Sequence, residues 1–76
     1  MQLTSLQRLR ISMLKGGESF VIYDDRLPPE ECYLEHPDGT IELVWMPSHS
    51  SKYSVKEKLG PVQIELLRRK FNFFRV

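Results

Sequence analysis

Residues 31–46, ECYLEHPDGTIELVWM, decide the fold, because they contain two strand-like runs joined by a turn signal. Asp38-Gly39 favours a two-residue type I′ turn, whose two central residues both need a positive φ. With these two residues as the loop, Glu35 lies opposite Glu42, and the other pairs follow from that register. Side chains alternate between the faces of a strand. One face of the hairpin is therefore expected to carry Cys32, Leu34, Leu43 and Trp45.

Further elements are expected before the hairpin. Residues 19–24, SFVIYD, are rich in β-branched and aromatic residues and predict a strand. Residues 3–14 have leucines at helical spacing, with Thr4 or Ser5 as a cap and Gly16-Gly17 as a stop, which predicts a helix. The alternative for the same segment is an alternating strand that turns at Gly16-Gly17 into the next strand.

After the hairpin, Ser54 and Glu57 fit a capping box, which predicts a short helix through Leu59. Gly60-Pro61 then predicts the start of another helix, since proline suits the first helical position. The apolar stripe of this last helix, at spacings of three and four residues, is Ile64, Leu67, Phe71 and Phe74.

These elements predict one small α+β domain over residues 1–76, in the order α-β-β-β-α. We expect a three-stranded antiparallel sheet with the N- and C-terminal helices packed on one of its faces. The covered face is expected to hold Phe20, Ile22, Cys32, Leu34, Ile41, Leu43 and Trp45. The other face is expected to carry Val21, Tyr23, Tyr33, Glu35, Glu42, Val44 and Met46.

The composition is that of an ordinary globular protein, with 41% hydrophobic and 28% charged residues. No apolar run approaches the roughly 20 residues that span a bilayer, and the N-terminus lacks the apolar core of a secretory signal. We therefore expect a soluble, cytoplasmic protein without a membrane partner. The single cysteine, Cys32, is expected to be a buried core residue rather than a reactive thiol.

The net charge of +1 conceals an asymmetry. Residues 18–42 contain eight acids and a single base, Arg26, whereas the remaining bases lie towards both ends. Two explanations stay open. The opposite charges attract each other within one fold, or they form two surfaces for two partners.

No constellation indicates catalysis, a metal or another cofactor. Zinc needs three or four converging ligands, and the only candidates, Cys32, His36, Asp38 and His49, do not supply two closely spaced pairs. Ser48-His49-Ser50 is a run of sequence neighbours, which rarely orients a base onto a hydroxyl. A hydrolase or nuclease would rest on Glu31, Glu35, His36 and His49, and this class ranks last.

The H-P-D-G run of residues 36–39, Pro47, His49 and the basic last helix together resemble HicA-type toxins loosely, over about the middle third of the chain. Those toxins are RNA-cleaving domains of a double-stranded-RNA-binding-like fold. Their catalytic histidine precedes the central strand in a Gly-Ser-His or similar context, where this chain reads Pro29-Glu30-Glu31. The resemblance therefore implies RNA binding without that chemistry.

The leading hypothesis is a small non-catalytic module that binds a protein partner or a second copy of itself. It would use a sheet face or the acidic loop 24–31, and its binding residues would be Tyr23, Tyr33, Glu35, Glu42 and Val44. The alternative is a nucleic-acid-binding domain. Its basic patch would be Lys56, Arg68, Arg69 and Lys70.

Overall fold

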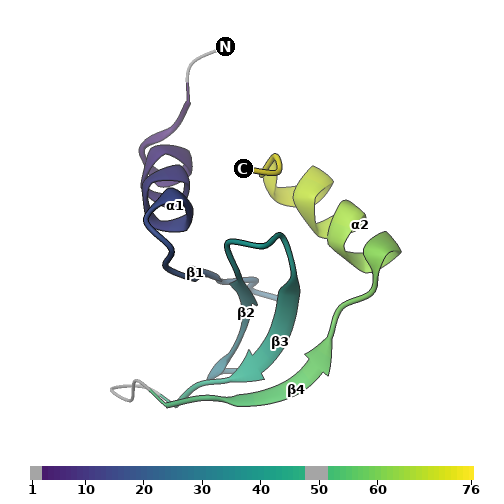
Figure 1. The fold of residues 1–76 in the computed structure, drawn as a ribbon. Helices are drawn as coiled ribbons and strands as arrows, with labels where there is room; N and C mark the ends of the chain where they lie inside the picture. The colour runs from purple at the N-terminus through teal and green to yellow at the C-terminus, as the bar shows by residue number, and fades with distance from the viewer. Residues whose placement is uncertain (1–2, 48–51) are drawn as a thin grey trace.

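The computed structural model describes residues 3–47 and 52–76, which form two helices and one antiparallel sheet of four strands (Figure 1). The elements are α1 (Ser5–Lys15), β1 (Phe20–Ile22), β2 (Glu31–Glu35), β3 (Ile41–Trp45), β4 (Ser54–Lys58) and α2 (Pro61–Phe71). The strands follow one another in sequence order across the sheet. The predicted α+β class with two terminal helices is confirmed, but the sheet has four strands instead of three.

Helix α1 is capped at both ends by its own sequence. The Thr4 hydroxyl accepts a hydrogen bond from the Gln7 amide, and the Gln7 side chain accepts one from the Thr4 amide. After the last turn Gly17 takes a φ of 85°, and the Glu18 amide donates to the Met13 carbonyl. The helical interpretation of this segment is confirmed, and the alternative strand is wrong.

The central hairpin turns through three residues, so the predicted two-residue loop is wrong. His36 donates its amide to the Thr40 carbonyl at 2.9 Å, and Gly39 has a φ of 93° whereas Asp38 has no positive φ. A type I′ turn needs both, and a three-residue loop needs only the glycine. The Asp38 carboxylate also accepts hydrogen bonds from the amide and the hydroxyl of Thr40. These bonds stabilise the longer loop.

The longer loop shifts the register by one residue. Glu35 pairs with Ile41, Leu34 with Glu42 and Tyr33 with Leu43. Because a shift of one residue moves side chains to the opposite face, Tyr33 and Glu35 lie on the helix-covered face. The predicted placement of Cys32 and Leu34 under the helices is therefore wrong. Both lie in a separate cluster with Val44 on the other face of the sheet.

Strand β4 occupies the segment for which a short helix was predicted. Five residues before Gly60-Pro61 are too few for a stable helix on their own, because helix nucleation is costly. Pairing with β3 instead satisfies the backbone of this segment on one side, with a register shift between Leu43 and Val44. All five residues of β4 are exposed, and β4 forms one edge of the sheet.

Helix α2 begins at Pro61 as predicted, and it ends earlier than the apolar stripe implies. Asn72 has a left-handed backbone with a φ of 57°, and the Phe73 amide donates to the Arg68 carbonyl. Because of this turn, Phe73 enters the core in place of Phe74, which the predicted stripe contained. Phe73 is 4% exposed and contacts Phe20 edge to face at 5.9 Å, whereas Phe74 is 64% exposed. The prediction that Phe74 lies in the core is wrong.

Both helices contribute to one core on one face of the sheet, as predicted. Figure 1 shows α1 and α2 on the same side of the curved sheet, with the C-terminal end of the chain between them. The buried residues of this core are Leu14, Phe20, Ile22, Ile41, Leu67 and Phe73. Trp45, expected in this core, is 43% exposed near the opposite end of the hairpin.

Candidate functional site

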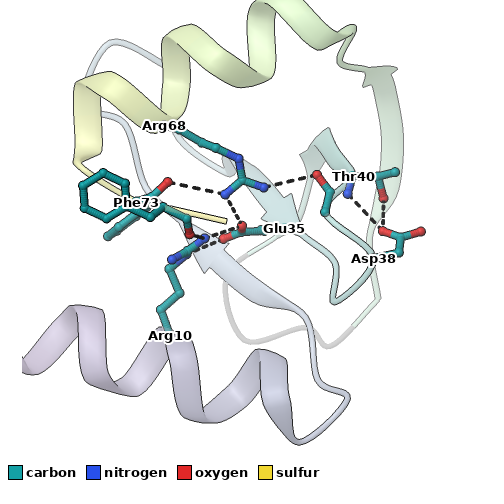
Figure 2. A network of polar contacts seen from close by, with 8 residues as sticks. Arg10, Glu35, Asp38, Thr40, Arg68 and Phe73 are labelled. Atoms are coloured by element: carbon teal, nitrogen blue, oxygen red, sulfur yellow. Dashed lines mark hydrogen bonds and ion pairs between the residues drawn. The ribbon is translucent and has the colours of Figure 1, made fainter. Parts of the chain in front are cut away.

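A buried charge cluster of Arg10, Glu35 and Arg68 lies between the two helices and the sheet (Figure 2). Arg10 donates from Nε to Glu35 Oε1 and from Nη2 to Oε2, both at 2.6 Å. Arg68 donates from Nη1 to the same Oε2 at 2.8 Å. The Glu35 side chain is 1% exposed and that of Arg10 is 3% exposed. Two guanidinium groups from two helices therefore enclose a single strand carboxylate.

Both arginines of the charge cluster also bind backbone carbonyls. Arg10 donates to the Phe74 carbonyl at 2.6 Å, and Arg68 donates to the carbonyls of Phe73 and Gly39. The Arg10 guanidinium also lies 4.9 Å from the centre of the Phe73 ring. Because the carboxylate is saturated and enclosed, the cluster joins α1, α2, the hairpin loop and the C-terminal tail. Its geometry is that of a structural connection.

The five residues predicted to bind a partner do not share one face. The register places Tyr33 and Glu35 on the helix-covered face, where Tyr33 packs against the core. Val44 is fully buried in the cluster on the other face, and Glu42 contacts His36. Tyr23 is 76% exposed. The prediction that these five residues share one face of the sheet is therefore wrong, because the observed register differs from the predicted one by one residue.

The four bases predicted to bind nucleic acid all form ion pairs within the chain. Arg68 binds Glu35, as described above. The other pairs are Lys56 with Glu31 at 3.0 Å, Arg69 with Glu65 at 3.2 Å and Lys70 with Asp24 at 2.8 Å. Three of these pairs join a basic C-terminal segment to an acid of the middle segment. This arrangement favours the explanation that the opposite charges of the sequence attract each other within one fold.

A cavity of about 740 Å³ is an open groove beside the loop between β1 and β2. We call it the acidic groove. Four acids and one base are among its lining residues. The residues are Tyr23, Asp24, Asp25, Leu27, Pro28, Pro29, Glu30, Glu31, Cys32, Met46, Pro47, Lys70 and Phe71.

Asp24 connects the acidic groove to helix α2. Its side chain is 2% exposed, and its Oδ2 accepts a hydrogen bond from Lys70 Nζ at 2.8 Å. Its Oδ1 accepts one from the Arg26 amide at 3.0 Å, which starts the turn of the loop. The hydrogen bonds from Lys70 and from the Arg26 amide lower the pKa of Asp24 to about 2, although burial opposes the shift.

Two other acids of the groove, Asp25 and Glu30, are exposed, and no ion pair among the described residues includes them. Glu30 has a φ of 73°, a conformation that is uncommon for residues other than glycine. Its carbonyl accepts a hydrogen bond from the Met46 amide at 2.6 Å, which holds the loop against the end of β3. Burial raises the pKa of the Cys32 thiol in the wall of this groove.

A second groove, of about 610 Å³, lies between the hairpin loop, α2 and the C-terminal tail. We call it the tail groove. It combines apolar walls with three arginines, of which Arg68 and Arg69 are ion-paired as described. The exposed Phe74 and Arg75 complete its rim.

A third polar arrangement joins Ser19, His36 and Glu42 on the sheet face away from the helices. Ser19 Oγ lies 2.8 Å from His36 Nδ1, and Glu42 Oε1 lies 2.6 Å from His36 Nε2. This group was not predicted from the sequence, because the predicted register paired His36 with Ile41 and so placed His36 and Glu42 on opposite faces. In the observed register His36 lies opposite Thr40, two residues before Glu42, so His36 and Glu42 lie on the same face of the sheet.

The described candidate residues of a hydrolase or nuclease are not brought together. Glu35 lies under the helices, and His36 lies on the opposite face of the sheet. His49 and the run Ser48-His49-Ser50 fall outside the described residues. Within residues 3–47 and 52–76, no group of three or more His, Cys, Asp or Glu residues is arranged to hold a metal ion. The described helices are also too short or too polar to cross a bilayer.

Comparison with known proteins finds no family model, no curated protein and no solved structure that matches this chain. The resemblance to HicA-type toxins therefore stays an expectation from the sequence.

Proposed function

We propose that this protein is a small interaction module whose acidic groove binds a basic, apolar segment of a protein partner. The observation that carries the proposal is the composition of the groove, where four acids and one lysine line a cavity that also has aromatic and proline walls. Oppositely charged groups across an interface steer association and select partners.

The free charges of the groove determine which partner fits. Asp24 pairs with Lys70 and neutralises its charge, so this lysine gives the groove no free positive charge. Asp25 and Glu30 are the exposed carboxylates at its rim. A partner segment with lysine or arginine would pair with these two acids, and its apolar side chains would contact the prolines of the loop.

Tyr23 supplies the aromatic contact. It is 76% exposed, and it lies beside the two free acids of the groove. Tyrosine is enriched among the residues that dominate interface energetics, because its large rigid side chain loses little entropy on binding. Of the five residues predicted from the sequence to bind a partner, Tyr23 is therefore the one that this proposal keeps.

The test is an NMR titration of the isotope-labelled protein with a short synthetic peptide of lysine and leucine. A matched peptide with glutamate in place of lysine is the control. We expect saturable shifts of the Tyr23, Asp25 and Glu30 amides with the lysine peptide only, and weaker binding at high salt.

Variants locate the binding site. The double variant Asp25→Asn with Glu30→Gln and the variant Tyr23→Ala should each weaken binding, whereas Glu57→Gln on the exposed strand β4 should not. Equal binding of both peptides, or shifts confined to residues outside the groove, would contradict the proposal.

A second candidate, single-stranded nucleic acid in the tail groove, is favoured by one observation: the 64% exposed Phe74 stands beside Arg69 and Arg75. Exposed aromatic rings stack on bases, and arginines contact phosphates. A fluorescently labelled single-stranded oligonucleotide should bind at low salt, with affinity lowered by Phe74→Ala and by Arg75→Gln. An absence of binding at low ionic strength eliminates this candidate.

A further inference from the structure

The hydrogen-bonded chain from Ser19 through His36 to Glu42 lies outside both grooves and outside the charge cluster. The three side chains come from the residue before β1, the residue after β2 and strand β3, which are neighbours in the sheet. The side chains of His36 and Glu42 are 23% and 20% exposed. The group is therefore held by regular structure and still reachable from solvent.

The positions of the protons follow from the chemistry of the three groups. An ionised Glu42 carboxylate only accepts hydrogen bonds, so the 2.6 Å contact requires the proton on His36 Nε2. In the neutral imidazole Nδ1 is then the acceptor, and the Ser19 hydroxyl donates to it across 2.8 Å. This is the order of hydroxyl, base and carboxylate that activates a serine for nucleophilic attack.

We propose that Ser19 is a nucleophile towards small, uncharged acyl esters, with His36 as its general base. Glu42 is a positioning residue, since it acts by fixing the tautomer and the orientation of the imidazole. The ring nitrogens have exchanged roles relative to the usual order, in which Nδ1 faces the carboxylate. The exchange leaves the proton path from hydroxyl to imidazole intact.

The surroundings of Ser19 favour an apolar acyl group. Val21 follows Ser19 on the same face of β1 and pairs with Leu34 of β2. Val21 packs against the apolar cluster of Cys32, Leu34 and Val44, so this cluster lies on the same face of the sheet as Ser19. An acyl chain of a few carbons would contact Val21 while its carbonyl carbon lies at Ser19.

The reaction proceeds in two balanced steps. Ser19 Oγ forms a bond to the carbonyl carbon and its proton passes to His36 Nδ1; the imidazolium then gives this proton to the leaving oxygen as the bond from that oxygen to the carbonyl carbon breaks, so an alcohol or phenol departs and His36 is neutral again. Water then attacks the acyl group and loses a proton to His36, and Ser19 Oγ leaves with a proton from the imidazole. A general base of this kind contributes on the order of 10² to 10⁴ in rate.

The first test is labelling of the unmodified protein with a fluorophosphonate probe, read by peptide mass spectrometry. In this reaction Ser19 Oγ forms a bond to phosphorus and fluoride leaves. We expect the label on Ser19 and none on the exposed Ser12. No label on Ser19, or labelling of both serines at the same rate, would overturn the proposal without any variant having to fold.

The second test uses p-nitrophenyl acetate as substrate with Ser19→Ala, His36→Gln and Glu42→Gln, each checked for native circular dichroism. His36→Gln should slow both hydrolysis and labelling at least tenfold. Ser12→Ala should match the unmodified protein. If folded His36→Gln is labelled at Ser19 as fast as the unmodified protein, the three residues are only a structural connection between strands.

The pH profile separates a base from a structural residue. Acid removes the Nδ1 acceptor by protonating the imidazole, so the labelling rate should fall on acidification in the unmodified protein and stay flat in His36→Gln. The charged groups near His36 are Glu42, Asp38 of the hairpin loop and, opposite Glu42, Lys58 of β4. Glu42→Gln keeps the base and should keep the fall in acid, but with slower labelling of Ser19 at every pH; a purely structural role would leave the labelling rate unchanged.

Discussion

Arg10 and Glu35, which are 25 residues apart in the sequence, form a two-pronged ion pair that is almost completely buried. Arg68 from the second helix binds the same carboxylate. Taking charges out of water is costly, and their mutual attraction offsets that cost only when the geometry is good and the remaining donors are satisfied. Here the arginines also donate to the carbonyls of Phe73, Phe74 and Gly39, and no buried side-chain nitrogen or oxygen of the described residues lacks a hydrogen-bond partner, so the condition is met.

The last two phenylalanines offer a matched test of where α2 ends. Phe73→Ala removes a ring that is 4% exposed and packs against Phe20, so we expect a loss of about 3–5 kcal/mol in the free energy of unfolding. Phe74→Ala removes a ring that is 64% exposed and should cost less than about 1 kcal/mol. Urea unfolding measures both. The reverse order would mean that the helix continues past Asn72.

Gly39 should resist substitution because of its backbone and not because of crowding. Its φ of 93° is strained for any residue with a Cβ, whereas an added Cβ would only meet the flexible Arg75 side chain at 3.4 Å. We expect Gly39→Ala to cost about 1–3 kcal/mol in thermal or urea unfolding. Gly39→Asn should cost less, since asparagine tolerates positive φ. Equal costs for the two variants would contradict the observed loop.

Asp24 should make part of the free energy of unfolding depend on pH in the acidic range. Its pKa is about 2 in the folded protein against 3.8 as the ordinary value, so its contribution is complete above pH 3.8 and is lost as the pH falls towards 2. When urea unfolding is measured at several pH values in this range, the free energy of unfolding should depend less on pH for Asp24→Asn than for the unmodified protein. Asp25→Asn, at the exposed neighbouring position, is the control and should keep the acid dependence of the unmodified protein.

The Cys32 thiol should react slowly with an alkylating reagent. It is 2% exposed, and burial raises its pKa, so little reactive thiolate is present at neutral pH. We expect full protection from iodoacetamide in native protein and rapid alkylation in denaturant, followed by mass spectrometry. Rapid alkylation in the native state would show that the wall of the acidic groove opens.

Local signals in the sequence were sufficient for the elements whose ends carry caps. Helix α1 follows from Thr4 and the glycine pair, and the start of α2 follows from Gly60-Pro61. The hairpin was also predictable, because Asp38-Gly39 separates two strand-like runs. What local signals did not determine was the loop length, because Asp-Gly suits both a two-residue and a three-residue turn.

That single ambiguity had large consequences for the site. A shift of one residue moved Tyr33 and Glu35 to the covered face and placed Glu35 between two arginines. Neither the charge cluster nor the group around His36 has a sequence signature, since their members come from different elements and meet only through the observed register and helix packing. β4 was missed for a similar reason, because its pairing with β3 is a tertiary contact that overrides a weak helix-capping pattern.

Glu35 joins both helices to the sheet, and the free energy of unfolding of Glu35→Gln measures this role most directly. Removing one partner leaves two buried guanidinium groups without their counter-charge, so we expect a loss of about 3–5 kcal/mol. The control is Glu65→Gln, which removes an exposed pair with Arg69 and should cost less than about 1 kcal/mol. If the two variants unfold at the same urea concentration, Glu35 does not hold the helices on the sheet.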